Sequence, residues 1–368
     1  MKPADLIASI AAWLAEEARP LWPELWAQAD ACRRQWVGDA VHLRGLIEIS
    51  NHCRRHCHYC GLAAGQQHLF RYRMADEEIL AAARQAHNFG YGTVVLQAGE
   101  DTGLDQQRVA ELLRRIKGET GLAITLSLGE RSDAEMALWR EAGADRYLLR
   151  FETSNRQLYR RIHPDCGADI SDRVALLRRL KDLGYAIGSG FMLGIPGQSR
   201  ADVVGDLLTL HELDCDMIGI GPYLPHPATP LGKLAERQRV VADQCPSDLT
   251  TVATAVALAR LLCPWANIPA TTAVATVDPA HGREDMLCRG ANVVMPNCTP
   301  LAYRELYQIY PNKACQQETA EQCHRCLAGR LHAIGRHPGQ GPGHAMARDA
   351  HPLPHIPVPR SQPCPSLP

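Results

Sequence analysis

Short apolar runs alternate with longer amphipathic helical patterns along most of this sequence, and this alternation constrains the fold more than any other feature. Parallel strands need crossover connections, so a repeated strand-then-helix order predicts a parallel sheet covered by helices. Eight such units favour a closed (βα)8 barrel of the TIM type over an open doubly wound sheet, which usually has fewer units. The predicted strands cover residues 46–49, 93–97, 123–128, 146–150, 185–193, 217–220, 270–274 and 292–295.

The helices between these strands have recognisable ends. Asp105 and Ser132 are typical N-cap residues, and Gly90 and Gly184 are typical of the position just beyond a helix. One predicted helix therefore begins after Asp105. The others cover residues 76–89, 132–143, 171–183, 199–213, 252–262 and 300–310.

The predicted barrel takes up residues 41–312 and leaves both ends of the chain outside it. Residues 1–40 read as helical turns interrupted by prolines, which predicts an N-terminal helical cap. Residues 313–337 form a C-terminal segment with a second group of cysteines. Residues 338–368 are rich in Pro, Gly and His, so they are expected to be disordered because such a composition cannot bury a core.

Composition narrows the class of protein. Hydrophobic residues make up 46% and charged residues 21%, as in an ordinary globular protein. A net charge of −1 gives no basis for binding nucleic acid or an anionic membrane. The amphipathic N-terminal pattern is not that of a signal peptide. With 14 cysteines, the sequence predicts a reducing cytoplasm, where clustered thiols indicate metal more often than disulfides.

The densest chemical signal is Cys53-Arg54-Arg55-His56-Cys57-His58-Tyr59-Cys60, spaced C-x3-C-x2-C on the loop after the first predicted strand. Three thiolates can hold a [4Fe–4S] cluster and leave one iron free for a small chelating molecule. The alternatives are zinc completed by His52, His56 or His58, and a thiol redox pair. With Tyr59 as its aromatic residue, the motif resembles the signature of the radical S-adenosylmethionine (SAM) superfamily. Members bind SAM at the open iron and cleave it reductively to a 5′-deoxyadenosyl radical.

A second group of thiols lies near the C-terminus. Cys315, Cys323 and Cys326 have the spacing C-x7-C-x2-C. This spacing suits a structural zinc ion completed by His324 or His332. It also suits a second iron–sulfur cluster, either [2Fe–2S] or [4Fe–4S].

The methionine end of SAM needs a fixed cation for its carboxylate and acceptors for its ammonium group. Glu100, Glu152 and Arg173 are the candidates, because each follows a predicted strand or begins a helix at the same end of the barrel. Ala98-Gly99-Glu100 resembles the Gly-Gly-Glu element of the superfamily, with Ala in the first position. The ordinary alternatives are a solvated Arg173 and a salt bridge between Glu152 and Arg150.

Longer strings make the resemblance more specific. Arg71-Tyr72-Arg73-Met74, Pro225-His226-Pro227 and the strings at residues 95–101, 125–130, 144–150, 219–222, 267–272 and 294–297 are similar to those of the HydE family. The members of this family are radical SAM maturases of [FeFe]-hydrogenase. The strings cover most of the chain and are far more specific than the cysteine triplet, which biotin synthase and methylornithine synthase share.

This resemblance implies roles for individual residues. The catalytic [4Fe–4S] cluster would be held by Cys53, Cys57 and Cys60, and a variable second cluster by Cys315, Cys323 and Cys326. SAM would contact Tyr59, Gly194 and Pro196 at the adenine, Glu152 and Arg173 at the methionine end, and Gln97, Gly99 and Glu100 nearby. The substrate cavity would be lined by Thr125, Arg150, Thr271, Thr272, Met295 and Tyr303.

The resemblance also implies a substrate and partners. The family's substrate is an iron–cysteinate complex carrying carbon monoxide and cyanide, which a tyrosine-cleaving radical SAM maturase delivers. The adenosyl radical would attack its sulfur on the path to the diiron precursor of the hydrogenase cluster. A GTPase scaffold and a reductant such as ferredoxin or flavodoxin are the other expected partners, and no nucleic acid or membrane is expected.

Two other functions remain open. One is a different radical SAM enzyme, similar to biotin synthase or methylornithine synthase, with the same barrel and cluster. The other is a non-catalytic iron–sulfur carrier or scaffold. A carrier would bind no SAM and would not require Glu152 or Arg173.

Overall fold

A computed structural model describes residues 3–167, 170–235, 243–350 and 356–359. Its strands pair in parallel in the order β6-β5-β4-β3-β2-β1-β7, and β8 pairs with β1. The strands are β1 (Ala40–Ser50), β2 (Thr93–Ala98), β3 (Ala123–Ser127), β4 (Arg146–Leu148), β5 (Ala186–Leu193), β6 (Met217–Pro222), β7 (Val293–Val294) and β8 (His337–Pro338).

The segment at residues 267–269 closes the ring between β6 and β7. Asn267 forms a parallel bridge with Met217 of β6, and Pro269 forms one with Val293 of β7. The backbone N–H of Asn267 donates to the carbonyl oxygen of Asp216 at 2.9 Å. The pairing with β6 therefore includes the residue just before this strand. The predicted TIM-type barrel of parallel strands is therefore confirmed.

The seventh strand was predicted at residues 270–274, and this prediction is wrong. The chain is extended at Thr271, and α11 (Thr272–Val277) follows at once. The extended segment between β6 and β7 is instead residues 267–269. Asn292 holds it in place, since its side-chain oxygen accepts from the N–H of Ile268 at 2.8 Å. Periodicity alone does not distinguish a short buried strand from a short buried helix, so the apolar run was misassigned.

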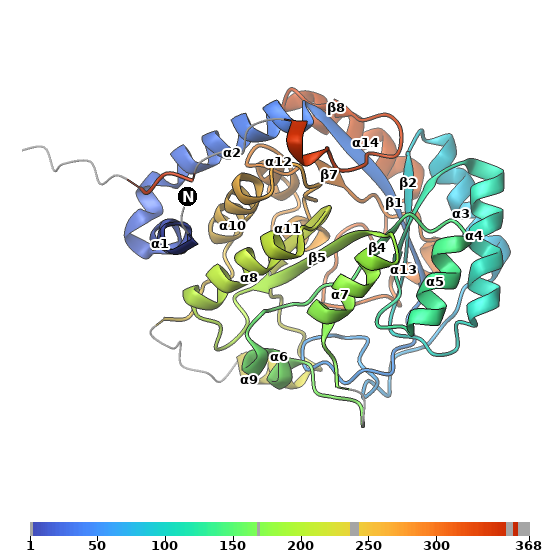
Figure 1. Ribbon diagram of the computed structural model, residues 1–368. Coiled ribbons are helices and arrows are strands. Elements are labelled where there is room, and N and C mark those ends of the chain that lie inside the picture. The colour runs from blue at the N-terminus through green and yellow to red at the C-terminus, as the bar shows by residue number, and fades with distance from the viewer. Residues whose placement is uncertain (1–2, 168–169, 236–242, 351–355, 360–368) are drawn as a thin grey trace, which may run out of the picture.

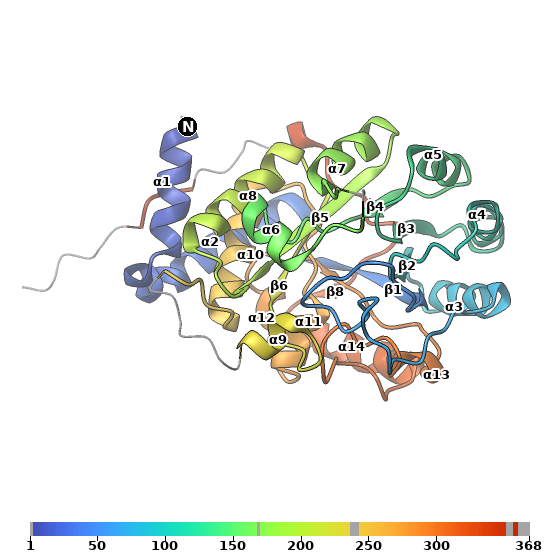
Figure 2. The same ribbon diagram turned by 90° about the horizontal axis from the view of Figure 1, so that it is seen from below.

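Helices surround the strands, and Figures 1 and 2 show α3, α4, α5 and α7 outside the sheet. The helices are α1 (Pro3–Leu14), η1 (Glu16–Leu21), α2 (Trp22–Val37), α3 (Asp76–Asn88), α4 (Gln106–Thr120), α5 (Asp133–Glu141), α6 (Arg156–Ile162), α7 (Arg173–Asp182), α8 (Arg200–Leu213), α9 (Pro230–Ala235), α10 (Leu249–Leu262), α11, α12 (Gly282–Leu287), α13 (Leu301–Arg304), α14 (Ala320–Ala333) and η2 (Arg348–Ala350). Asp105 and Ser132 are N-caps, as predicted. The closing helix predicted at 300–310 is only the short α13.

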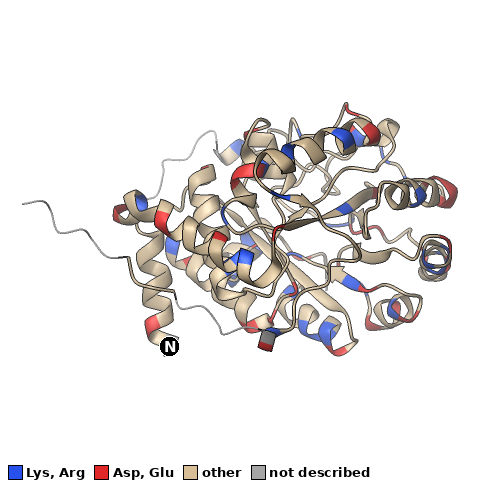
Figure 3. Cartoon of the chain, turned by 90° about the horizontal axis from the view of Figure 1, so that it is seen from above, with Lys and Arg blue, Asp and Glu red and all other residues tan. Residues whose placement is uncertain are grey.

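Acidic and basic residues are interspersed along the outer helices in Figure 3, in keeping with the net charge of −1. The N-terminal helices pack on the barrel, with α2 against α10 and α1 against α8. Within the described ranges, no helix is both long and apolar enough to cross a membrane.

The end of the chain was predicted to be disordered from residue 338 onward; most of its described residues are exposed, but some of its carbonyls bond to the barrel. The carbonyl of Pro342 accepts from Arg146 Nη2 at 2.8 Å and from Thr93 Oγ1 at 2.9 Å. The carbonyl of Gly343 accepts from Arg44 Nη2 at 3.0 Å. A Pro- and Gly-rich segment leaves many carbonyls unused by secondary structure, so it can satisfy buried guanidinium groups at the base of the barrel. The rest of the predicted tail, 351–355 and 360–368, lies outside the described residues.

Replacing Gly92 with Ala is expected to destabilise the fold by about 1–3 kcal/mol. A Cβ atom at Gly92 would lie 1.6 Å from the carbonyl oxygen of Gly341, so the C-terminal segment would have to move. Gly118→Ala is the matched control, because a Cβ there meets nothing within 4 Å and Ala favours the helix by roughly 0.5–1 kcal/mol. Urea unfolding measures both, and equal effects of the two variants would contradict the packing of this segment.

Candidate functional site

The three cysteines of the first motif line one cavity of about 310 Å³ inside the barrel. Cys53 Sγ accepts a hydrogen bond from the N–H of Glu100, and Cys60 Sγ accepts one from the N–H of Leu62, both at 3.4 Å. Burial raises the pKa of the Cys60 thiol to about 12, and the neighbouring Cys53 adds to the shift. Thiolates at this site therefore need a bound cation to compensate their charge.

The loop that carries these cysteines is anchored to distant parts of the chain. The N–H of His58 donates to the carbonyl of Ile162 at 2.8 Å, and the carbonyl of His58 accepts from Leu231 at 2.9 Å. Gly61 donates to the carbonyl of Ile309 at 3.0 Å. In Figure 1 the loop after β1 accordingly lies with α6 and α9 at the lower end of the barrel. The loop is therefore held in place by three different segments.

A chain of alternating charges runs beside the cysteine loop. Glu100 Oε1 accepts from Arg54 Nε at 2.7 Å and from Arg55 Nε at 2.6 Å. Arg55 Nη2 pairs with Glu130 Oε2 at 3.0 Å, and Glu130 Oε1 pairs with Arg173 Nε at 3.0 Å. Glu100, which was predicted as a SAM ligand, lines the cavity, and its carboxylate also holds the cysteine loop. Glu130 was not predicted, because only the fold brings it to the arginines.

Gly99 has a steric reason to be glycine. A Cβ atom on it would lie 2.2 Å from the carbonyl oxygen of His52 and 2.8 Å from Cys53 Cβ. Only glycine therefore lets the loop after β2 pack against the cysteine loop.

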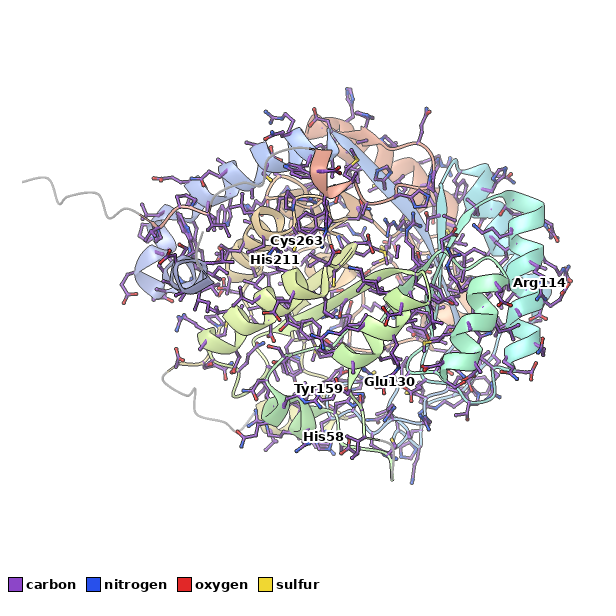
Figure 4. The ribbon with its side chains drawn as sticks, viewed as in Figure 1. His58, Arg114, Glu130, Tyr159, His211 and Cys263 are labelled. Carbon is purple, nitrogen blue, oxygen red and sulfur yellow. The ribbon has the colours of Figure 1, made fainter. Side chains whose placement is uncertain are left out.

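Arg173 is fixed in the cavity wall by three hydrogen bonds. Besides Glu130, it donates from Nη1 to the carbonyl of Arg150 at 2.7 Å and shares Nη2 with His163 Nε2 at 2.8 Å. A guanidinium has five N–H donors, and these bonds use three, so two remain for a ligand. Figure 4 shows Glu130, Tyr159 and His58 at the same lower end of the molecule.

His163→Gln is expected to change how stability depends on pH. Burial, together with Arg173, lowers the pKa of His163 to about 2, so the folded protein keeps this imidazole neutral. The unfolded chain takes up a proton below the ordinary pKa of 6.5, hence the contribution of His163 is present above pH 6.5 and is lost as the pH falls. The difference in unfolding free energy between wild type and variant should move by about 1.4 kcal/mol between pH 7.5 and 5.5. A constant difference would contradict a neutral buried His163.

Glu152 follows β4 in a left-handed conformation, with φ of 66°, and its side chain is buried. Its Oε2 lies 3.2 Å from Arg150 Nη2, so the salt bridge considered as the ordinary alternative is present. Within the described part of the chain, the buried atoms Arg150 Nε and Thr125 Oγ1 have no hydrogen-bond partner, and Glu152 Oε2 has its ion pair with Arg150 but no hydrogen bond. All three residues line the cavity, so unsatisfied polar groups face the space where a polar ligand would bind.

Most of the predicted site residues share this cavity. Those that line it are Cys53, Cys57, Cys60, Tyr59, Gln97, Gly99, Glu100, Thr125, Arg150, Glu152, Arg173, Thr271, Thr272 and Met295. Gly194 and Pro196 are not among the lining residues and lie on the turn after β5. Tyr303 also lies elsewhere, because its hydroxyl donates to Glu78 at 2.9 Å and its ring stacks on Tyr72.

Many lining residues were not predicted, and four of them, Tyr307, Tyr310, Glu48 and Lys313, come together only in the folded chain. Tyr307 and Tyr310 occupy the place assigned to Tyr303, because α13 ends early and the following turn points these rings inward. Glu48 and Lys313 form a buried ion pair in the same wall, with 1% and 3% of their side chains exposed. In the sequence, the one feature that could have indicated this ion pair was the charged Glu48 within an otherwise apolar predicted strand.

The second group of cysteines is only partly assembled. The thiol of Cys323 donates to Cys315, and together with Arg283, 3.3 Å from Cys315 Sγ, lowers the pKa of Cys315 to about 5. Cys326 is exposed on α14. Among the described residues, no three His, Cys, Asp or Glu side chains converge closely enough to hold a single metal ion.

The first group of cysteines suits an iron–sulfur cluster better than a zinc ion. Cys53, Cys57 and Cys60 face one cavity without converging on one point, as the corners of a larger inorganic body require. The unsatisfied atoms of Glu152, Arg150 and Thr125 and the free donors of Arg173 fit a small zwitterionic ligand beside it. A model of the radical SAM superfamily matches residues 47–210. The fold and the site define a radical SAM enzyme, a class that uses a [4Fe–4S] cluster and SAM.

Similarity to individual proteins narrows the class. The chain is 48% identical to [FeFe] hydrogenase maturase subunit HydE of Thermotoga maritima, over 86% of this chain and 87% of that protein. It is 28% identical to 3-methylornithine synthase of Methanosarcina acetivorans, over 77% of each. Its structure matches that of methylornithine synthase PylB with a TM-score of 0.71 and 24% identity, over 91% of this chain and 97% of the other. The chain belongs to the HydE family of radical SAM maturases.

Proposed function

We propose that this protein acts in assembling the active-site cluster of [FeFe]-hydrogenase by radical SAM chemistry on an iron-containing substrate. The observation that carries the proposal is the single cavity that joins the three cysteines to Glu152, Arg150, Thr125 and Arg173. The 48% identity to a HydE protein supports the same activity.

The residues of the cavity have separate proposed tasks. Cys53, Cys57 and Cys60 would hold the [4Fe–4S] cluster. When bound there, SAM supplies a 5′-deoxyadenosyl radical after reduction by one electron. Glu152 would accept from its ammonium group, and the two free donors of Arg173 would bind its carboxylate. Tyr59 and the turn that contains Gly194 and Pro196 would lie against the adenine, with Gln97, Gly99 and Glu100 close by.

Other residues that line the cavity would hold the substrate. Thr125, Arg150, Thr271, Thr272 and Met295 line it, and Tyr307 and Tyr310 take the place predicted for Tyr303. With SAM and substrate bound, the barrel walls would limit access of water, so a radical would meet the bound target first. The proposed substrate is an iron–cysteinate carrying carbon monoxide and cyanide, and its sulfur is the proposed site of attack.

Partners follow from this proposal. A tyrosine-cleaving radical SAM maturase would supply the substrate, a GTPase scaffold would accept the product, and a ferredoxin or flavodoxin would supply the electron. Cys315, Cys323 and Cys326 would hold a second iron–sulfur cluster of unspecified type, with the low pKa of Cys315 favouring a thiolate ligand.

Anaerobic reconstitution with iron and sulfide, followed by dithionite and SAM, tests the proposal. The expected results are a SAM-dependent change in the paramagnetic spectrum of the cluster and release of 5′-deoxyadenosine. Adding the iron–cysteinate complex should then give product, whereas dethiobiotin and lysine should not be consumed. A colourless protein that holds zinc, or a cluster that ignores SAM, would overturn the proposal in favour of a zinc protein or an iron–sulfur carrier.

A further inference from the structure

A buried carboxylate joins the two loops that are proposed to bind opposite ends of SAM. The first loop follows β4 and contains Glu152, which is proposed for the methionine end of SAM. The second is the turn of residues 194–197 after β5, proposed for the adenine. Asp206 lies behind both loops on α8, and its side chain is completely buried.

One oxygen of Asp206 holds the first loop. Asp206 Oδ1 accepts from the hydroxyl of Thr153 at 3.2 Å, from the hydroxyl of Ser154 at 2.7 Å, and from the N–H of Ser154. These residues directly follow Glu152, whose left-handed backbone would otherwise relax. The carboxylate therefore fixes the exit of the chain from Glu152.

The other oxygen of Asp206 holds the second loop through Gln198. Gln198 Nε2 donates to Asp206 Oδ2 at 3.2 Å and to the carbonyl of Met192 at 2.9 Å. Gln198 Oε1 accepts from the N–H of Gly194 at 2.8 Å and from that of Ile195 at 3.3 Å. The side chain of Gln198 thus spans the base of the turn, with bonds to the end of β5, to the turn and to Asp206.

We propose that Asp206 and Gln198 are positioning residues that set the distance between the two SAM-binding loops, without touching SAM themselves. The inference rests on the proposed function, since it concerns the same cofactor site. It predicts that SAM affinity depends on the bond between Asp206 and Gln198, even though both lie behind the loops.

The presence of a carboxylate at position 206 supports a role in positioning the two loops rather than in stabilising the fold. Among the described residues, Asp206 has no cationic partner, and burial raises its pKa to about 7. A neutral side chain would avoid this desolvation. All the neighbours of Asp206 are donors, however, so only a group with two acceptor oxygens satisfies both loops at once.

The test is a polarity exchange across the Asp206–Gln198 bond. Asp206→Asn keeps the shape but turns an NH2 group toward Gln198 Nε2, so the link between the loops is lost. Adding Gln198→Glu restores it, because burial keeps the new carboxyl group protonated. Its O–H donates to the carbonyl of Met192 in place of Gln198 Nε2 and the same oxygen accepts from the amide introduced at position 206, while the other oxygen still accepts from Gly194. Asp216→Asn is the matched control, since Asp216 is a partly buried carboxylate that accepts from the N–H of Ile187 at 2.8 Å, before β6 begins.

Two measurements decide the inference. Hydrogen exchange of the ligand-free protein should speed up at residues 152–155 and 193–198 in Asp206→Asn, and return to wild-type values in the double variant. Binding of S-adenosylhomocysteine to the reconstituted protein should weaken about 10-fold or more in the single variant, as expected for a lost charge-assisted bond, and recover in the double variant. Asp216→Asn should change neither.

Unchanged exchange in these segments, or weakened binding that the second substitution does not recover, would overturn the inference. If the wild-type protein binds no S-adenosylhomocysteine, the proposed function fails, and the exchange data still decide whether Asp206 and Gln198 couple the loops.

Discussion

Replacing Cys57 with Ala is expected to abolish 5′-deoxyadenosine formation and to lower the iron content of the reconstituted protein. Cys57 is the central thiol of the triplet and is buried at 8% exposure, so no water-exposed group can take its place. Loss of a direct ligand should exceed the roughly 10–100-fold cost of losing an outer partner of a metal ligand. Release of 5′-deoxyadenosine and the iron-to-protein ratio are the two measurements.

Cys166→Ala is the matched control for this prediction. The thiol of Cys166 also lies beside the cysteine loop, where it donates to the carbonyl of Arg54 at 3.6 Å, but it is outside the triplet. This variant should keep its iron and its activity. Wild-type turnover in Cys57→Ala, or an equal loss in both variants, would contradict the assignment of the triplet.

Replacing Lys313 with Met is expected to destabilise the fold by about 3–5 kcal/mol, the usual result of leaving one charge of a buried pair alone. Lys313 Nζ contacts Glu48 Oε1, and the carbonyl of Tyr307 accepts from the same ammonium at 3.3 Å. Without the ammonium, the one bond that the Glu48 carboxylate keeps to the described residues is a long one of 3.4 Å from Asn297 Nδ2. The urea midpoint should fall with little change in the slope of the transition.

The double variant Glu48→Gln with Lys313→Met should recover most of that loss, because it removes both charges together. Arg84→Met is the surface control. Arg84 pairs with Glu119 on exposed helices, and its loss should cost within about 1 kcal/mol. If Lys313→Met is no more destabilised than Arg84→Met, the pair is not buried in solution as it is in this structure.

Local patterns in the sequence predicted the repeating part of the fold. Asp105 and Ser132 cap helices because their side chains reach N–H groups two or three residues away, which sequence neighbours alone determine. The segment at 267–269, which closes the barrel, was not predicted because its position depends on residues far away in the sequence. It is held by Asn292 and by bridges to Met217 and Val293, and such distant partners leave no periodic pattern in the sequence.

The candidate site divides in the same way. The spacing of Cys53, Cys57 and Cys60 and their position after the first strand were sufficient to predict that they face one cavity, because parallel strands share one functional end. The partners of the predicted residues could not be inferred. The ion pairs of Glu100 with Arg54 and Arg55 were not predicted, and Tyr307 lines the cavity where Tyr303 was expected.

The sequence by itself determined the alternation of strands and helices, the cysteine triplet and hence the class of chemistry, since all three depend on residues close together in the chain. Only the tertiary structure decided which charges are paired, which polar atoms remain open to a ligand, and that Asp206 joins two loops. These properties depend on contacts between residues far apart in sequence, and burial gives those contacts their strength by removing competing water.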